Sequence, residues 1–308
     1  WAVYLASPTY RRRLRLHLEQ AGYGQLLRPA IVEAGKSVFE LPFIWCAPPE
    51  RVLQTATLHD WDVAQAALDS GRGVIFLTPH LGCFEIIAQA IASRAPLTAL
   101  YRPPKKASLR PLLEQARARG GLSLAPANLA GVRTLIKTLR SGGAIGLLPD
   151  QVPQFGEGVW TPFFGRPAYT MTLPAKLHQM SGAPLVLSYA ERLPDGQGYA
   201  VHFVRFDGVL EGSPEQQART INAAMESLVA RCPAQYFWSY NRYKGTPVPS
   251  SAFATLEIAV ICGTPTPATI RVVQIDPGPI PTLTASAPAS SSAFAASAVA
   301  MFPPMTST

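Results

Sequence analysis

The chain has 308 residues, 48% hydrophobic and 15% charged, enough to bury one large core or two modest ones. Its formal charge of +8 favours an anionic partner, which could be nucleic acid, a phospholipid surface or an acidic small molecule. The four cysteines form no CxxC pair and no zinc-like spacing with histidine, which argues against a disulfide framework or a structural metal and favours a reducing cytoplasmic setting.

A basic helix is predicted at the start of the chain. Residues 9–22 have amphipathic spacing and end at Gly22, and four arginines cluster in their first half: Arg11, Arg12, Arg13 and Arg15. The cluster fits the cytoplasmic flank of a membrane anchor and a solvated helix face equally well. Because the chain begins without methionine, we expect an upstream segment to be missing. A second helix is expected around residues 31–41.

From residue 61 onward, short apolar runs alternate with helical stretches. Strands are expected in GVIFLTP (73–79), LTALY (97–101), LSLA (122–125), AIGLLPD (144–150), PLVLSYAER (184–192) and GYAVHFV (198–204). Helices are expected at 61–71, 84–93, 108–119, 128–140, 171–181 and 214–231, and a loop rich in Gly, Pro and aromatic residues at 151–169. This alternation predicts an α/β fold with a central, mostly parallel or mixed sheet flanked by helices.

The last part of the chain differs in composition. Residues 246–308 are crowded with Pro, Ala, Ser and Thr, and their only charged side chains are Glu257, Arg271 and Asp276. This composition predicts a mostly disordered or aberrant tail, and its long uncharged run is too rich in small and hydroxyl residues to favour a transmembrane helix. The predicted organisation is an N-terminal helical, membrane-proximal segment (1–60), an α/β domain (61–245) and the tail (246–308).

The segment TPHLGCFEI places a histidine directly after an apolar strand and a glutamate five positions later. Reactive groups gather at the carboxyl ends of strands in such sheets, so His80 and Asp150, each just past a strand, could share one edge. An imidazole can take a proton from an alcohol that attacks a carbonyl, and Glu85 on the next helix could fix its tautomer. A purely structural pair is the alternative, and spacing alone does not decide.

Several other positions have two interpretations. Cys83 could be a thiol nucleophile at a helix N-terminus or a small packing residue. Asp150 could orient Arg133 or a substrate hydroxyl, or cap a turn. Arg102 and Arg166 could bind anionic groups of substrate or carrier, or be solvated. The central loop is aromatic, and its rings could line an acyl channel, meet a bilayer or close a core: Phe155, Trp160, Phe163 and Phe164.

Several familiar catalytic signatures are absent. The sequence has no GxSxG elbow, no GxxxxGK[ST] loop, no HExxH and no GxGxxG after a strand, which argues against a serine hydrolase, a P-loop NTPase, a zincin and a Rossmann dehydrogenase. An acyl thioester is already activated, so a positioned alcohol and one base can suffice without metal, cofactor or covalent intermediate. The missing signatures are those that such a reaction does not need.

The ordered set of motifs resembles a known family. PHLGCFE matches the His-four residues-acidic motif of glycerolipid-type acyltransferases, and LYRPPKK, LLPDQVP, TPFFGRPA and CPAQYFWSYNRYK follow it in that order. Over about residues 8–245 this set resembles the late acyltransferases of lipid A biosynthesis, the lauroyl/myristoyl transferase family. A single HxxxxE is a weak signal, whereas the ordered set is a strong one.

The resemblance implies a glycerolipid acyltransferase-like fold and an enzyme at the cytoplasmic face of the bacterial inner membrane. Such an enzyme moves a fatty acyl chain from acyl carrier protein to a hydroxyl of a Kdo-bearing lipid A precursor. By this analogy His80 is the general base and Glu85 its partner. The residues expected to bind substrate are Arg102, Arg133, Asp150 and Arg166. We expect the family's usual N-terminal membrane helix to lie in the upstream segment that we expect to be missing.

Three alternatives remain beside this interpretation. The same site could serve another acceptor, such as a lysophospholipid or another glycolipid. The chain could be a peripheral membrane-binding protein with an inactive site, although the intact His80 and Glu85 argue against it. Nucleic-acid binding has only the net charge in its favour and no motif, so we expect no such partner.

Overall fold

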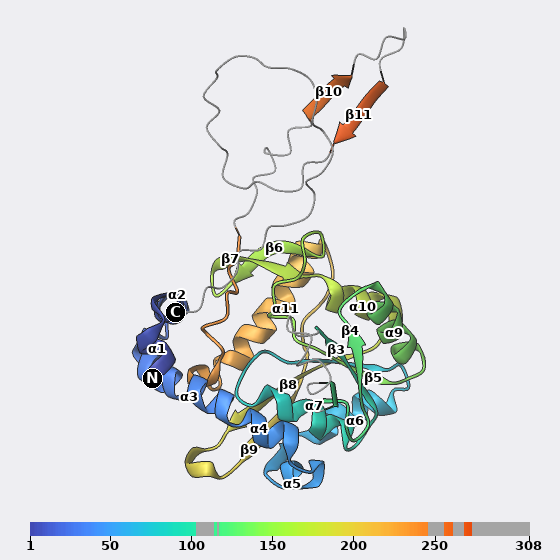
Figure 1. Ribbon diagram of the computed structural model, residues 1–308. Coiled ribbons are helices and arrows are strands. Elements are labelled where there is room, and N and C mark those ends of the chain that lie inside the picture. The colour runs from blue at the N-terminus through green and yellow to red at the C-terminus, as the bar shows by residue number, and fades with distance from the viewer. Residues whose placement is uncertain (103–113, 116, 246–255, 261–267, 273–308) are drawn as a thin grey trace. The chain divides into compact units, whose positions relative to one another are not determined.

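The computed structural model describes residues 1–102, 114–115, 117–245, 256–260 and 268–272 (Figure 1). They fall into two units, Trp1–Pro247 and Val248–Thr308. The described part of the second unit is an antiparallel pair of strands, β10 (Leu256–Val260) and β11 (Ala268–Val272), which its composition did not predict. The predicted disorder of the rest of the tail, and most of the predicted helix 108–119, lie outside the described residues. No described helix is both long and apolar enough to cross a bilayer.

A seven-stranded mixed sheet forms the centre of the first unit, in the order β1-β9-β8-β2-β5-β3-β4 (Figure 1). Its strands are β1 (Ala56–His59), β2 (Val74–Leu77), β3 (Leu97–Tyr101), β4 (Leu122–Pro126), β5 (Ala144–Leu147), β8 (Leu185–Arg192) and β9 (Tyr199–Arg205). Neighbours pair in parallel except β8 and β9, which are antiparallel. The predicted α/β fold is confirmed, and β1 is an edge strand that the sequence did not reveal.

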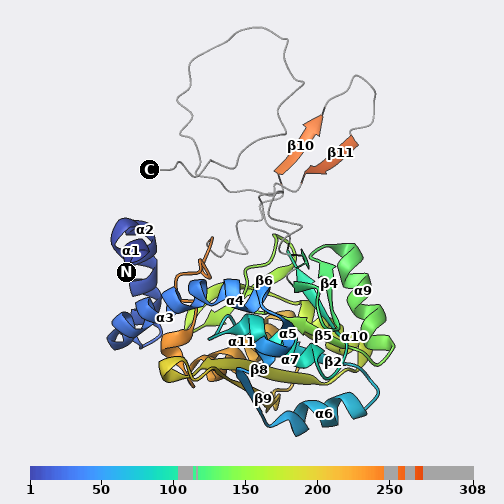
Figure 2. The same cartoon turned by 60° about the horizontal axis from the view of Figure 1, so that its bottom comes forward.

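Helices cover both faces of the sheet. The alternating side chains of β2 divide the core, because Ile75 and Leu77 join one apolar cluster while Val74 and Phe76 join the other. The first cluster includes side chains of α9 (Leu129–Arg140), α10 (Leu173–Ser181) and α11 (Pro214–Val229). The second includes α4 (Leu41–Cys46), α5 (Pro49–Leu53), α6 (Trp61–Asp69) and α7 (Phe84–Ala92). Figure 2 brings the second face forward, with α5 and α7 before the sheet.

The N-terminal helices belong to the same unit as the sheet. They begin with α1 (Ala2–Ala6), α2 (Pro8–Gln20) and α3 (Leu27–Phe39), so the two predicted N-terminal helices are present. The buried His17 of α2 donates from Nδ1 to the carbonyl oxygen of Trp238 over 2.7 Å. Burial lowers the pKa of His17, with the charges of Arg166 and Arg13 acting in the same direction, so the ring is neutral near pH 7. This bond ties α2 to the segment that follows α11.

The prediction of a loop at 151–169 was wrong in its second half. Residues there form an antiparallel ribbon of β6 (Gly158–Phe163) and β7 (Arg166–Met171). Phe164 and Gly165 both have positive φ, of 46° and 73°, which is the geometry of a two-residue hairpin turn. Phe163 is 1% exposed and joins the core, as does Phe164 in part, so these two rings close the core.

Candidate active site

Parallel pairing of β2 and β5 brings a histidine and an aspartate together. Leu77 of β2 faces Leu147 of β5, and His80 and Asp150 each lie three residues further along their strands. The His80 Nδ1 lies 2.9 Å from Asp150 Oδ1, and the His80 backbone N–H donates to Oδ2, also over 2.9 Å. The two residues therefore share one edge of the sheet, as predicted from their positions after the strands.

The Asp150 carboxylate is buried, with 1% of its surface exposed, and it accepts a third hydrogen bond from the Tyr236 hydroxyl over 3.1 Å. Burial raises the pKa of this carboxyl, but the charge and hydrogen bonds of His80 and the charge of Arg242 outweigh it and hold the pKa below its ordinary value. An ionised carboxylate can only accept, so the proton of the His80 ring lies on Nδ1. The lone pair of Nε2 is then left to accept a proton from a substrate.

Gln151 stands at the other nitrogen of the ring. Its side-chain amide Nε2 lies 3.1 Å from His80 Nε2, which makes the amide the donor in the tautomer set by Asp150. Gln151 also lines two neighbouring cavities, together with Leu100 and Arg102. The Gln151 side chain therefore contacts His80 and borders both cavities.

The two cavities differ in lining. The His80 cavity has a volume of about 220 Å³, and its polar lining residues are His80, Glu85, Gln89, Tyr101, Arg102, Arg117 and Gln151. The second, here called the apolar cavity, has a volume of about 300 Å³ and includes Leu100, Leu129, Val132, Val152, Met171 and Leu173. A cavity of mixed lining that contains His80 and several charged side chains thus adjoins a space suited to a hydrocarbon chain.

Glu85 points to a different partner from the one predicted. Its carboxylate pairs with Arg117 through two hydrogen bonds, from Nη2 to Oε1 and from Nε to Oε2, the second over 3.1 Å. Trp45 donates from its indole N–H to Oε2 over 3.3 Å. The tautomer-fixing contact expected of Glu85 belongs to Asp150 in the structure, because the backbone and ring donors of His80 both face the loop after β5.

The Arg117 guanidinium lies between two aromatic rings inside the His80 cavity. Its central carbon is 5.4 Å from the Trp45 ring centre and 5.6 Å from that of Tyr101. Stacking on both rings and the bidentate bond to Glu85 hold the cation in one orientation. Because Arg102 lines the same cavity, two cations are present there for an anionic group of a substrate.

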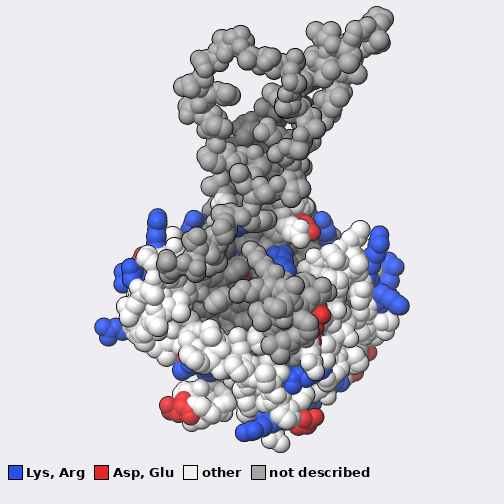
Figure 3. Space-filling model, in the orientation of Figure 1, with Lys and Arg blue, Asp and Glu red and all other residues white. Residues whose placement is uncertain are grey.

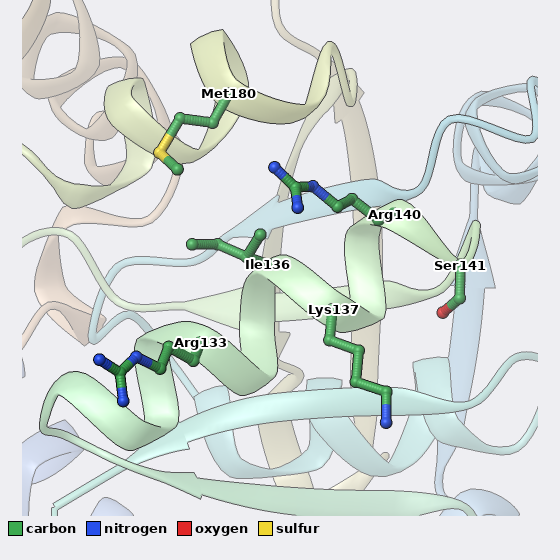
Figure 4. A pocket seen from close by; sticks show the side chains of 6 residues that line it. All are labelled: Arg133, Ile136, Lys137, Arg140, Ser141 and Met180. Atoms are coloured by element: carbon green, nitrogen blue, oxygen red, sulfur yellow. The ribbon is translucent and has the colours of Figure 1, made fainter.

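The structure does not bring two of the predicted arginines to His80. Arg133 lies on α9 and lines a separate groove between α9 and α10 (Figure 4). Arg166 of β7 donates to Gln20 Oε1 over 3.1 Å and stacks on the Tyr243 ring at 4.7 Å. Asp150 contacts neither of them through a hydrogen bond, so the idea that it orients Arg133 finds no contact among the described residues. Arg102 and Asp150 are the predicted substrate-binding residues that lie at the site.

Comparison with known proteins places this arrangement in a family. The model of the bacterial lipid A biosynthesis acyltransferase family matches residues 24–245. The chain belongs to this family. The lipid A biosynthesis palmitoleoyltransferase of Escherichia coli K12 is 26% identical over 222 residues, which cover 71% of each chain. The lauroyltransferase of the same organism is 27% identical over 223 residues, or 70% of this chain and 71% of that one. The myristoyltransferase is 26% identical over 196 residues, or 62% and 59%.

As a member of this family the protein is an acyltransferase. The buried Cys83 has no place in the chemistry that the geometry favours. Cys83 is 1% exposed and precedes the first turn of α7. Burial raises the pKa of its thiol far above the ordinary value, and the nearby charge of Glu40 acts in the same direction. A protonated thiol in an apolar cluster is a packing residue and a poor nucleophile.

Sequence reasoning singled out His80 and Asp150 but missed several residues that complete the candidate site. Gln151 and Tyr236 stand inside the quoted motifs LLPDQVP and CPAQYFWSYNRYK, yet no role was assigned to them. Trp45 and Arg117 lie outside every quoted motif and reach the site only through the tertiary fold. Composition or spacing offers no signal for these last two.

Proposed function

We propose that this acyltransferase moves a fatty acyl chain from the thioester of acyl carrier protein to a hydroxyl of a Kdo-bearing lipid A precursor. The observation that carries the proposal is the His80 and Asp150 pair beside two adjoining cavities, in a chain of this family. The names of its relatives specify palmitoleoyl, lauroyl and myristoyl transfer in lipid A biosynthesis, which supports the same acceptor class. We place the reaction at the cytoplasmic face of the bacterial inner membrane, where both substrates meet.

The proposed chemistry needs no covalent intermediate. The acceptor hydroxyl gives its proton to His80 Nε2 while its oxygen attacks the thioester carbon, and a tetrahedral oxyanion forms. Collapse of the oxyanion breaks the C–S bond, and the leaving thiolate takes the proton back from the imidazolium. Asp150 keeps the ring in the reactive tautomer and stabilises the imidazolium while it exists. Thiol and ester are then the only products, and no oxidant or reductant enters.

The oxyanion needs a donor, and the four backbone N–H groups from His80 to Cys83 already donate to other acceptors. The N–H groups of His80, Leu81, Gly82 and Cys83 donate to Asp150 and to the carbonyl oxygens of Pro79, Gln235 and Ala190. We assign the donor role to the Gln151 amide, which lies 3.1 Å from His80 Nε2. When the acceptor hydroxyl takes its place at Nε2, the amide can turn to the thioester oxygen.

Glu85 acts in this proposal through Arg117 and not through His80. The guanidinium that it fixes between Trp45 and Tyr101 would bind a phosphate of the donor arm or of the acceptor. Both substrates named in the proposal carry phosphate, so either could use Arg117 together with Arg102. In this assignment the glutamate of the HxxxxE motif contributes to substrate binding through Arg117, whereas Asp150 orients the His80 imidazole.

Replacing Glu85 by glutamine is expected to raise KM for a phosphate-bearing substrate by roughly 10- to 100-fold, with a smaller change in kcat. The amide keeps the shape of the carboxylate but cannot hold Arg117 through a charged, bidentate pair. Steady-state kinetics on both substrates would measure the split between KM and kcat. Glu50→Gln is the matched control, because Glu50 is an exposed acid in the first turn of the short helix α5. A fall in kcat as large as the one expected for Asp150→Asn would instead indicate that Glu85 acts on the His80 imidazole, as the sequence predicted.

The function itself is tested with the wild-type protein in mixed micelles. Labelled acyl carrier protein thioester and a Kdo-bearing lipid A precursor are supplied, and mass spectrometry should find the precursor heavier by one acyl chain. A lysophospholipid and a second glycolipid are offered in parallel reactions. Acylation of one of these in place of the precursor would refute the proposed acceptor. Vesicle binding without transfer to any acceptor would indicate the inactive membrane-binding protein.

A further inference from the structure

A basic groove runs between α9 and α10, on the helix that also borders the apolar cavity. This open groove has a volume of about 590 Å³, and its lining residues are Arg133, Ile136, Lys137, Arg140, Ser141 and Met180. Figure 4 shows Met180 of α10 above Ile136 of α9, with Arg133 and Arg140 on either side of Ile136. Figure 3 shows Lys and Arg side chains at the right-hand edge of the molecule, where Figure 1 draws these two helices.

The cations of the groove are exposed and share one helical face. Arg133, Lys137 and Arg140 follow each other at intervals of four and three residues, and the buried side of α9 carries Leu135 and Leu139. No acidic residue lines the groove, and none of the three cations forms a salt bridge within the described part of the chain. The surface therefore presents positive charge that the described residues do not neutralise.

Helix stability explains only part of this pattern. Lys137 and Arg140 lie in the last turn of α9, where cations stabilise the helix by opposing its dipole. Arg133 lies in the N-terminal half of the helix, where a cation gains nothing from the dipole. Stabilisation of the helix therefore explains Lys137 and Arg140 but not Arg133. Binding of an anionic partner explains all three positions.

The groove is connected to the reaction site through α9. Leu129 and Val132, in the first turn of the helix, line the apolar cavity together with Lys176 of α10. That cavity shares Gln151 with the His80 cavity. A partner bound along α9 would therefore deliver a tethered acyl chain to the apolar cavity and its thioester to Gln151 and His80.

We infer that the groove between α9 and α10 is the docking site for an acidic helix of the protein that carries the acyl thioester. The inference rests on the proposed function, which names an acyl carrier protein as donor. Charge complementarity selects an acidic partner. The hollow with Ile136 and Met180 in its lining favours a convex helix bearing an apolar side chain over a flat bilayer surface.

The test reverses two of the charges and compares two donors. Lys137→Glu with Arg140→Glu is expected to raise KM for the carrier-bound donor by about tenfold or more at low salt, with kcat within about twofold. The same double variant should use a carrier-free acyl-pantetheine thioester as well as the wild type does. Adding Arg133→Glu should raise KM for the carrier-bound donor further. Arg51→Glu with Arg72→Glu is the control, since both arginines are exposed, lie outside the groove and change the net charge equally.

Each outcome separates the docking inference from the proposed function. An unchanged KM for the carrier-bound donor, or an equal rise in the control pair, would overturn the docking site while leaving the acyl transfer intact. A loss of binding to phosphatidylglycerol vesicles with no change in KM would assign the groove to the membrane and also overturn the inference. Absence of transfer from any carrier-bound donor by the wild type would instead refute the proposed function.

Discussion

Replacing Asp150 by asparagine is expected to lower kcat for acyl transfer by about 10³- to 10⁴-fold while the fold stays intact. Asparagine has the size of aspartate and can still accept from the Tyr236 hydroxyl and the His80 backbone N–H. Its amide group, however, does not require the proton on Nδ1 and cannot stabilise an imidazolium by charge. The ring would lose its preference for the tautomer in which Nε2 is the base.

The partner variant His80→Ala should lower kcat by a similar factor, and the double variant should be no worse than either single one. Groups that act as one unit give such non-additive losses, whereas independent groups give multiplied losses. Single-turnover kinetics with a preloaded thioester would isolate the chemical step, and circular dichroism with thermal melting would check the fold. If Asp150→Asn kept more than a tenth of the wild-type kcat, Asp150 would not be the residue that orients His80.

The sequence was most informative where a strand leads directly into a polar residue. The apolar run Val74–Leu77 predicted β2, and Ala144–Leu147 predicted β5, so the residues after both strands could be placed at one edge. Strands that are buried on both faces have continuous apolar runs, which can be recognised in the sequence without knowing the neighbouring strands. β1 and the ribbon of β6 and β7 lack such runs. The Gly and Pro content of residues 151–169 predicted a loop, although Pro162 and Pro167 pair in a two-stranded ribbon and Gly165 lies in its tight turn.

The site was less predictable than the fold because proximity in sequence differs from proximity in space. Glu85 follows His80 by five residues, yet its carboxylate meets Trp45 and Arg117, which come from distant segments. Asp150 lies 70 residues from His80 and reaches it because β2 and β5 are paired in register. Spacing predicts which helix a side chain is on, but the packing around that helix decides which neighbour the side chain contacts.

Arg133 illustrates the same limit for a substrate-binding role. Its place in a helical pattern was correctly predicted, since α9 spans Leu129–Arg140. The side of the helix that faces the reaction site depends on how α9 packs on the sheet, and the packed side carries Leu135 and Leu139. Arg133 consequently lies in the basic groove and not in the His80 cavity.

Gln151 is the residue with the second large expected effect. Replacing it by alanine should lower kcat for acyl transfer by about 10²-fold with little change in KM, because the lost amide would stabilise only the oxyanion of the transition state. Replacement by glutamate should be more damaging, since a carboxylate has no N–H donor and repels the developing negative charge. Gln154→Ala, an exposed glutamine three residues later in the same loop, is the matched control.

Slow hydrolysis of the thioester provides the decisive readout for this role. Water attacking the same carbon forms the same oxyanion, so a residue that stabilises it must assist hydrolysis as well as transfer. Gln151→Ala should therefore slow both reactions by a similar factor, measured by release of the free thiol with and without acceptor.

Two other results would assign Gln151 differently. Loss of transfer with normal hydrolysis would mean that its amide positions the acceptor hydroxyl. Faster transfer would mean that its bond to His80 Nε2, 3.1 Å long in the structure, merely blocks the base until substrate displaces it. A parallel loss of both reactions agrees with a donor that turns from the imidazole to the thioester oxygen, because both reactions form the same oxyanion.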